Sequence, residues 1–258
     1  LAIVFFYLFI VHILTSRHAL FDPVTFRDRN FTIGITLALI MGMLQFTPMV
    51  LFPPLLQDLR GYPDSIVGYL ISARGMGNFL SFFIVVQFTR FNARLCLFTG
   101  LTLQSVAGLW MSSLDINITT ADVFWTNILH GIGFGTAYTP MAVLTFSTLP
   151  KHLLTQGNAI FSLCRLLGSS IFIALTLVVF FRTSAEATVN LNAMIDAFDL
   201  RNLSLWITIL GEPGTPPLHA RLLEEVRHQA SMIGYINAFH LLTLASALAA
   251  PVAFLFVI

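Results

Sequence analysis

Residues 26–62 read FRDRNFTIGITLALIMGMLQFTPMVLFPPLLQDLRGY, and this stretch decides the fold. Its interior, residues 30–57, contains no Asp, Glu, Lys or Arg. A helix needs about 20 predominantly apolar residues to cross the hydrocarbon core of a bilayer, so this run is long enough to span. Arg27 and Arg29 precede it, whereas Asp58 follows it. Because Lys and Arg favour the cytoplasmic side, the stretch predicts a transmembrane helix that begins in the cytoplasm.

The composition of the whole chain indicates an integral membrane protein. Of its 258 residues, 57% are hydrophobic and only 10% are charged, whereas a soluble domain carries about 25% charged residues. No basic run points to a nucleic-acid partner. Neither an HExxH motif, a CxxC motif nor a phosphate-binding loop is present, so we expect no metal, no cofactor and no enzymatic site. Cys96 and Cys164 lie in apolar segments, where they are expected to be packing residues.

Five more apolar segments follow the first, and the loops between them alternate in charge. The links on one side carry Arg94 and Lys151, whereas a link on the other side carries Asp115 and Asp122 and no basic residue. This alternation predicts an all-α membrane protein in which residues 31–258 form a six-helix transmembrane bundle. The predicted spans are 31–56, 66–88, 95–114, 123–149, 159–181 and 232–256.

The remaining segments frame this bundle. Residues 1–14 are apolar but short for a span, and we interpret them as the end of a preceding transmembrane helix in a longer protein; a signal peptide would need a basic n-region, which is missing. Residues 15–30 are expected to be a cytoplasmic link. Residues 182–231 are polar and predict a long exterior loop, in which 185–198 and 218–228 lie on the membrane surface as amphipathic helices.

Two arginines fall inside predicted spans. A charge at the centre of a bilayer costs about 2.5–3.5 kcal/mol on insertion scales, and no Asp or Glu lies within any span to pair with Arg74 or Arg165. One interpretation is structural: the arginines bond to helix carbonyls and to neighbours such as Gln45, Asn78 or Asn127, or Arg165 reaches back to the cytoplasmic interface. The other is that they face a partner domain or a substrate.

Small residues and prolines indicate how the helices pack. Gly131 and Gly135 lie four residues apart, so one face of their helix is bare and close packing is favoured over a gating role for the bend expected at Pro140. Gly168 is a further packing candidate. Pro48 and two later prolines are expected to bend or end the first span, because proline removes a backbone donor.

Several segments, taken in order, resemble the carboxy-terminal half of the drug:proton antiporter-2 family. This family is the fourteen-helix multidrug efflux branch of the major facilitator superfamily. The resemblance implies two six-helix bundles with two extra helices between them, of which 31–258 is the second bundle and 1–14 the end of an extra helix. It also implies that 182–231 is a large periplasmic loop. The segments are FRDRNFTIG (26–34), LFPPLLQDLRGYPDSIVGYL (51–70), SARGMG (72–77), HGIGFGTAYTP (130–140), SLCRLLGSSI (162–171) and RHQASMIGYINAFHLL (227–242).

The same resemblance implies partners and a location. It implies a multi-pass protein of the bacterial inner membrane, surrounded by lipid and completed by a missing amino-terminal bundle that carries the proton-coupling carboxylates. Its ligands would be a small molecule and protons, and a periplasmic adaptor protein is a further partner that the family admits. The loop TRFNAR, with Arg90 and Arg94, resembles a cytoplasmic gating motif, but Thr89 stands where an acid is expected.

These observations predict one half of an efflux transporter that exports drug-like amphipathic compounds by alternating access. The alternatives are an exporter of one metabolite or siderophore-like compound and a non-transporting membrane scaffold. An intramembrane enzyme would need a cluster of His, Asp or Glu at one depth, and the spans offer none. The residues predicted to lie along the substrate pathway are polar or soft and lie inside spans: Gln45, Met49, Arg74, Asn78, His130, Tyr138 and Arg165.

Overall fold

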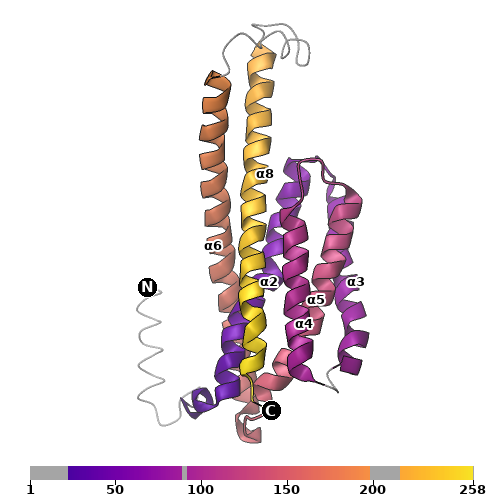
Figure 1. Cartoon of the computed structure of the whole chain (residues 1–258), viewed down its shortest axis with the longest axis vertical. Helices are drawn as coiled ribbons and strands as arrows, with labels where there is room; N and C mark the ends of the chain where they lie inside the picture. The colour runs from indigo at the N-terminus through magenta and orange to yellow at the C-terminus, as the bar shows by residue number, and fades with distance from the viewer. Residues whose placement is uncertain (1–22, 89–91, 198–215, 258) are drawn as a thin grey trace.

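The computed structural model describes residues 23–88, 92–197 and 216–257, and their regular structure is helical throughout (Figure 1). This confirms the predicted all-α fold class. The long helices are α2 (Arg29–Asp58), α3 (Asp64–Phe88), α4 (Ala93–Ser112), α5 (Thr120–Phe146), α6 (Leu154–Ala197) and α8 (Pro216–Ala249), and the short 3₁₀ helices are η1 (Pro23–Arg27), η2 (Lys151–Leu153) and η4 (Ala250–Leu255).

Five helical segments in the described ranges are long and apolar enough to cross a membrane: Arg29–Asp58, Asp64–Phe88, Ala93–Ser112, Lys151–Ala193 and Leu223–Leu255. The remaining predicted span, 123–149, corresponds to α5, which is long but is not among these five segments. Thr126, Asn127 and His130 are buried in α5 and lower its hydropathy. Because α5 packs against both α3 and α4, much of its surface faces protein rather than lipid.

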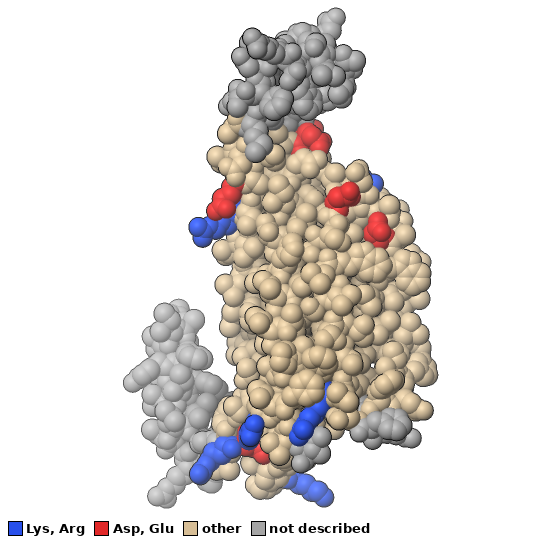
Figure 2. Space-filling view, viewed as in Figure 1, with Lys and Arg blue, Asp and Glu red and all other residues tan. Residues whose placement is uncertain are grey.

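The charged residues separate into two levels (Figure 2). On the visible face, most of the Lys and Arg lie at the lower end, where α2 begins, and most of the Asp and Glu lie near the upper end, together with other basic side chains; between these levels the surface is uncharged. Arg29 starts α2, Arg94 lies in the first turn of α4, and Lys151 precedes α6, so successive links return to one end of the bundle. This distribution fits the predicted positive-inside orientation.

Bare backbone faces allow the helices to approach closely. A Cβ built on Gly131 or Gly135 of α5 would collide with α3, at the Arg74 carbonyl oxygen and the Ser81 hydroxyl respectively. A Cβ on Gly168 of α6 would collide with the Leu39 backbone of α2. Small residues at such points let neighbouring backbones touch, so the structure places the predicted glycines at helix contacts.

None of the predicted proline positions ends its helix. Pro48, Pro53 and Pro54 lie inside α2, which continues to Asp58, and Pro140 lies inside α5, which continues to Phe146. A proline inside a helix leaves the carbonyl four residues earlier without its usual donor, so each of these helices must find a substitute donor or leave that carbonyl unbonded.

The segment predicted as a long loop is helical at both of its ends. Instead of leaving the helix at residue 182, α6 continues to Ala197, and α8 begins at Pro216 (Figure 1). The separate surface helices predicted at 185–198 and 218–228 are therefore wrong in their described parts, which continue α6 and lead directly into the last span. The reason is local. Residues 169–210 contain neither Gly nor Pro, so the change from apolar to polar side chains does not end the helix.

The exterior position of 182–231 stays a prediction. The predicted helix end 1–14 and most of the predicted link 15–30 lie outside the described residues, as does Arg90.

Asn30 ties three chain segments together at the lower end of the bundle. Its amide nitrogen donates to the Val257 carbonyl oxygen at 2.6 Å and to the Ser147 hydroxyl at 3.2 Å, and its amide oxygen accepts from the Val257 N–H at 2.8 Å. Next to it, the Asp28 carboxylate caps α2 and accepts from the Thr148 hydroxyl at 2.8 Å. The start of α2, the end of α5 and the segment after η4 are thereby joined.

We expect Asn30→Ala to lower the free energy of unfolding by about 1–2 kcal/mol, because the variant loses these hydrogen bonds and leaves the partly buried N–H and carbonyl of Val257 without this partner. The measurement is a denaturation curve of the purified protein in mixed micelles. Thr36→Ala is the matched control, since Thr36 is exposed on the same helix and bonds only to the carbonyl of its own preceding turn. An equal decrease in the free energy of unfolding of the two variants would contradict a stabilising role for the hydrogen bonds of Asn30.

Candidate functional site

Two arginines from different helices reach neighbouring residues in the middle of α2. The Arg165 Nη1 atom on α6 donates to the Gln45 side-chain oxygen at 2.6 Å. The Arg74 Nη2 atom on α3 donates to the Leu44 carbonyl oxygen at 3.1 Å. Leu44 and Gln45 stand at the centre of the 30-residue helix α2. The guanidinium of Arg165 therefore reaches the middle of a membrane helix, not the cytoplasmic interface as one interpretation of the sequence allowed.

The bond from Arg74 compensates for a proline. The N–H of residue 48 would donate to the carbonyl of residue 44 in a regular α-helix, but Pro48 has no N–H. Arg74 supplies the missing donor from a neighbouring helix. The same arrangement recurs in α5, where Pro140 frees the Thr136 carbonyl and the Cys96 thiol of α4 donates to it at 3.6 Å.

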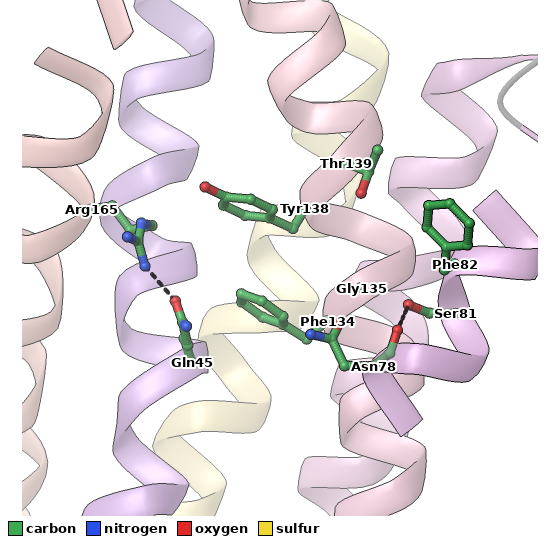
Figure 3. Close-up of a pocket in the computed structure, with 9 residues that line it drawn as sticks. All are labelled: Gln45, Asn78, Ser81, Phe82, Phe134, Gly135, Tyr138, Thr139 and Arg165. Carbon is green, nitrogen blue, oxygen red and sulfur yellow. Dashed lines mark hydrogen bonds between the residues drawn. The ribbon is translucent and has the colours of Figure 1, made fainter. Parts of the chain in front are cut away.

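A cavity of about 430 Å³ lies beside this pair of arginines (Figure 3). Figure 3 shows the Arg165–Gln45 pair on one side and Asn78 with Ser81 on the other, with the rings of Phe134 and Tyr138 between them. The Ser81 hydroxyl donates to the Asn78 backbone carbonyl at 2.6 Å. The walls come from α2, α3, α5 and α6 and comprise Gln45, Asn78, Ser81, Phe82, Phe134, Gly135, Tyr138, Thr139 and Arg165.

The two aromatic rings connect the two arginines. Phe134 and Tyr138 stack with their centroids 5.5 Å apart and their planes at 15°. The Arg74 guanidinium carbon lies 5.9 Å from the Phe134 centroid, and that of Arg165 lies 5.9 Å from the Tyr138 centroid. Each arginine is thus within the range of a cation–π contact with one ring of the stacked pair. Guanidinium, amide, hydroxyl and aromatic groups suit this cavity to binding a ligand.

The structure brings together four of the predicted pathway residues: Gln45, Asn78, Tyr138 and Arg165 all line the cavity. Arg74 is buried behind the wall, with 8% of its surface exposed, and contacts Phe134. Met49 does not line the cavity and is 47% exposed.

Two other predicted residues also lie away from the cavity walls. His130 is completely buried, and neither ring nitrogen has a hydrogen-bond partner among the described residues. Arg94 lies in the first turn of α4, where the Asn92 side chain accepts hydrogen bonds from the Arg94 and Leu95 N–H groups.

The sequence did not single out Ser81, Phe82, Phe134 or Thr139, and it assigned Gly135 only to packing. Ser, Thr and Phe are ordinary residues of membrane helices, so their residue types alone do not indicate that they line a cavity. Helical spacing could have identified Phe134, because it stands four residues before the predicted residue Tyr138 and therefore shares its helix face.

Comparisons with known proteins find relatives described as resistance or export proteins. A "Colistin resistance protein EmrB" of Acinetobacter baumannii is 27% identical over 163 residues, which are 62% of this chain and 32% of that protein. A "Multidrug export protein EmrB" of Haemophilus influenzae is 22% identical over 232 residues, 88% of this chain and 45% of that protein. A "Putative multidrug resistance protein MdtD" of Escherichia coli is 31% identical over 176 residues, 64% of this chain and 35% of that protein.

The chain thus spans less than half the length of these relatives. Their descriptions confirm the resemblance to a multidrug efflux branch, and with the five apolar helices they support a multi-pass protein of the bacterial inner membrane. The family profile of the Major Facilitator Superfamily matches residues 2–173. Because this match covers more than half of the 258 residues, the chain belongs to the Major Facilitator Superfamily.

Proposed function

We propose that the complete protein exports amphipathic, drug-like small molecules by alternating access, in exchange for protons. The single observation that carries this proposal is the cavity at the middle of α2, because its volume of about 430 Å³ is in the range of small-molecule sites. Its walls combine aromatic faces with a few polar groups, as such sites usually do. Transporters of related folds bind their substrates near the midplane of the membrane, where this cavity lies along α2.

The second wall of the site is proposed to come from an amino-terminal bundle. Phe82 lines the cavity and is 64% exposed, so this wall lies open in the described structure. Apolar side chains stay exposed along the neighbouring turns of α3, including Phe79 at 66% and Phe83 at 61%. A second bundle would cover part of this surface and close the cavity.

Proton coupling is proposed to reside on that second bundle. The sequence has no Asp or Glu between Asp28 and Asp58, between Asp64 and Asp115, or between Asp122 and Glu186. The cavity walls therefore lack a carboxylate that could take up and release a proton during export. A periplasmic adaptor protein remains a proposed partner of the complete pump. The proposal includes no catalytic step.

Export can be tested by filling the cavity. Thr139→Trp places a large ring into the site from an exposed position, and we expect it to reduce export at least about tenfold, the factor that corresponds to about 1.4 kcal/mol. The measurement is efflux of a fluorescent amphipathic dye from cells that lack their own pumps and express the complete protein. Thr99→Trp is the control, because Thr99 is also exposed but lies on α4, which contributes no residue to the cavity.

Two results would count against the proposal. No efflux of any dye by the correctly inserted wild-type protein would contradict export itself. Unchanged efflux by Thr139→Trp, with normal amounts of protein in the membrane, would show that this cavity is not on the pathway.

A further inference from the structure

The charge at the cavity is positive and lacks an opposing carboxylate in the described structure. Arg165 lines the cavity and Arg74 lies directly behind its aromatic wall. The salt bridge that the described residues form is Arg182–Glu186, on the surface of α6 and away from the cavity. Neither guanidinium group is therefore paired with a carboxylate of the described residues.

Arg165 retains binding capacity. Its guanidinium has five N–H donors, and the described structure commits Nη1 to the neutral side-chain oxygen of Gln45. A neutral acceptor orients the guanidinium without cancelling its charge. Arginine presents its donors as a planar fork that matches the two oxygens of a carboxylate.

The groups around Arg165 suit the rest of an amphipathic molecule. The rings of Tyr138, Phe134 and Phe82 line the same cavity and offer an apolar surface, and Tyr138 lies next to the guanidinium. Arg74, 5.9 Å from the Phe134 centroid, adds a second positive charge behind that surface. In surroundings of low dielectric constant, such charges attract an anion and repel a cation more strongly than they would in water.

We propose that this cavity selects amphipathic anions, with Arg165 binding the anionic group and the Phe134–Tyr138 pair holding the apolar body. The inference rests on the proposed export function and specifies its substrate class. A cationic compound of the same shape is disfavoured because it would have to lie beside two guanidinium groups that no described carboxylate neutralises.

The test compares three fluorescent probes that share one aromatic body: pyrenebutyrate, its uncharged methyl ester and the cationic pyrenebutylamine. The complete protein is purified into phosphatidylcholine nanodiscs, and the signal from empty nanodiscs is subtracted to remove partitioning into lipid. We expect the wild-type protein to bind the carboxylate at least about tenfold more tightly than the ester, and the amine most weakly. Equal affinity for the three probes, or tightest binding of the amine, would overturn the inference.

Variants assign the selectivity to one residue. Arg165→Gln should weaken binding of the carboxylate about tenfold and change binding of the ester less than about twofold, whereas Arg165→Lys should retain most of the preference. Arg182→Gln, on the same helix but exposed and paired with Glu186, should change neither affinity. If Arg165→Gln weakens all three probes equally, its role is structural and the inference fails. If that variant does not fold, the order of the three affinities measured with the wild-type protein still tests whether the cavity selects anions.

Transport of the same three probes separates this inference from the function on which it rests. Export of the ester and the amine but not of the carboxylate would overturn anion selection and leave export standing. Selective binding of the carboxylate without transport of any probe would overturn export and leave the binding preference of the cavity standing.

Discussion

Gly77→Ala is expected to lower the free energy of unfolding by about 2–3 kcal/mol, near the upper range for overpacking at a tight contact. Gly77 of α3 faces the Ile128 backbone of α5, and a Cβ there would lie 2.9 Å from the Ile128 carbonyl carbon and closer still to its oxygen. Real Cβ atoms do not approach a backbone so closely. The two helices must therefore move apart, which weakens one of the most extensive helix contacts in the described structure.

Gly75→Ala is the matched control for this prediction. Gly75 lies two residues earlier on the same helix, and a Cβ there meets nothing within 4 Å. Alanine is the better helix former by about 0.5–1 kcal/mol, so this variant should be as stable as the wild-type protein or slightly more stable. Denaturation curves in mixed micelles measure both variants, and similar stabilities would refute the close contact between α3 and α5.

The loss of Arg74 is expected to cost about 2 kcal/mol less when residue 48 is alanine than when it is proline. With Pro48 present, Arg74→Met removes the donor that the described structure provides for the Leu44 carbonyl and leaves that carbonyl unpaired. With Pro48→Ala, the new N–H of residue 48 can donate to the same carbonyl inside α2. The Arg74 bond then becomes dispensable.

A double-mutant cycle measures this coupling. The single variants Arg74→Met and Pro48→Ala and their combination are unfolded under identical conditions, and the coupling is the deviation of the double variant from the sum of the single ones. The result does not depend on what the buried guanidinium costs by itself, since that cost is common to both backgrounds. A coupling near zero would mean that Arg74 does not compensate for Pro48.

Much of this fold could be predicted from the sequence, because a bilayer imposes length and polarity on each helix. The uncharged run after Arg29 predicted α2, and the alternation of basic and acidic links predicted on which end of the bundle each connection lies. The other long helices could be predicted for the same reason, except that α5 is not among the five segments apolar enough to cross a membrane. The end of α6 could not be predicted in this way, because hydropathy falls at residue 182 whereas the helix continues to Ala197.

The candidate site was only partly predictable. Gln45, Asn78 and Arg165 could be predicted because they are polar and lie inside spans, and polar side chains are costly next to lipid. The proline rule marks the Leu44 carbonyl as free, since the positions involved are four apart in the sequence. Neither rule tells that Arg74, 30 residues further on, is the donor that reaches it. That information comes from the packing of α3 against the rest of the bundle, which a single sequence does not encode in any local pattern.

The tie at Asn30 has a consequence for the order in which the chain is assembled. Asn30 leaves the ribosome 227 residues before Val257, whose backbone supplies two of its three hydrogen-bond partners. During synthesis its amide therefore lacks these two bonds until α8 and the segment after η4 have been made. Closure of this end of the bundle therefore waits until Val257 has been synthesised, and a change in the backbone at Val257 would act first on the beginning of α2.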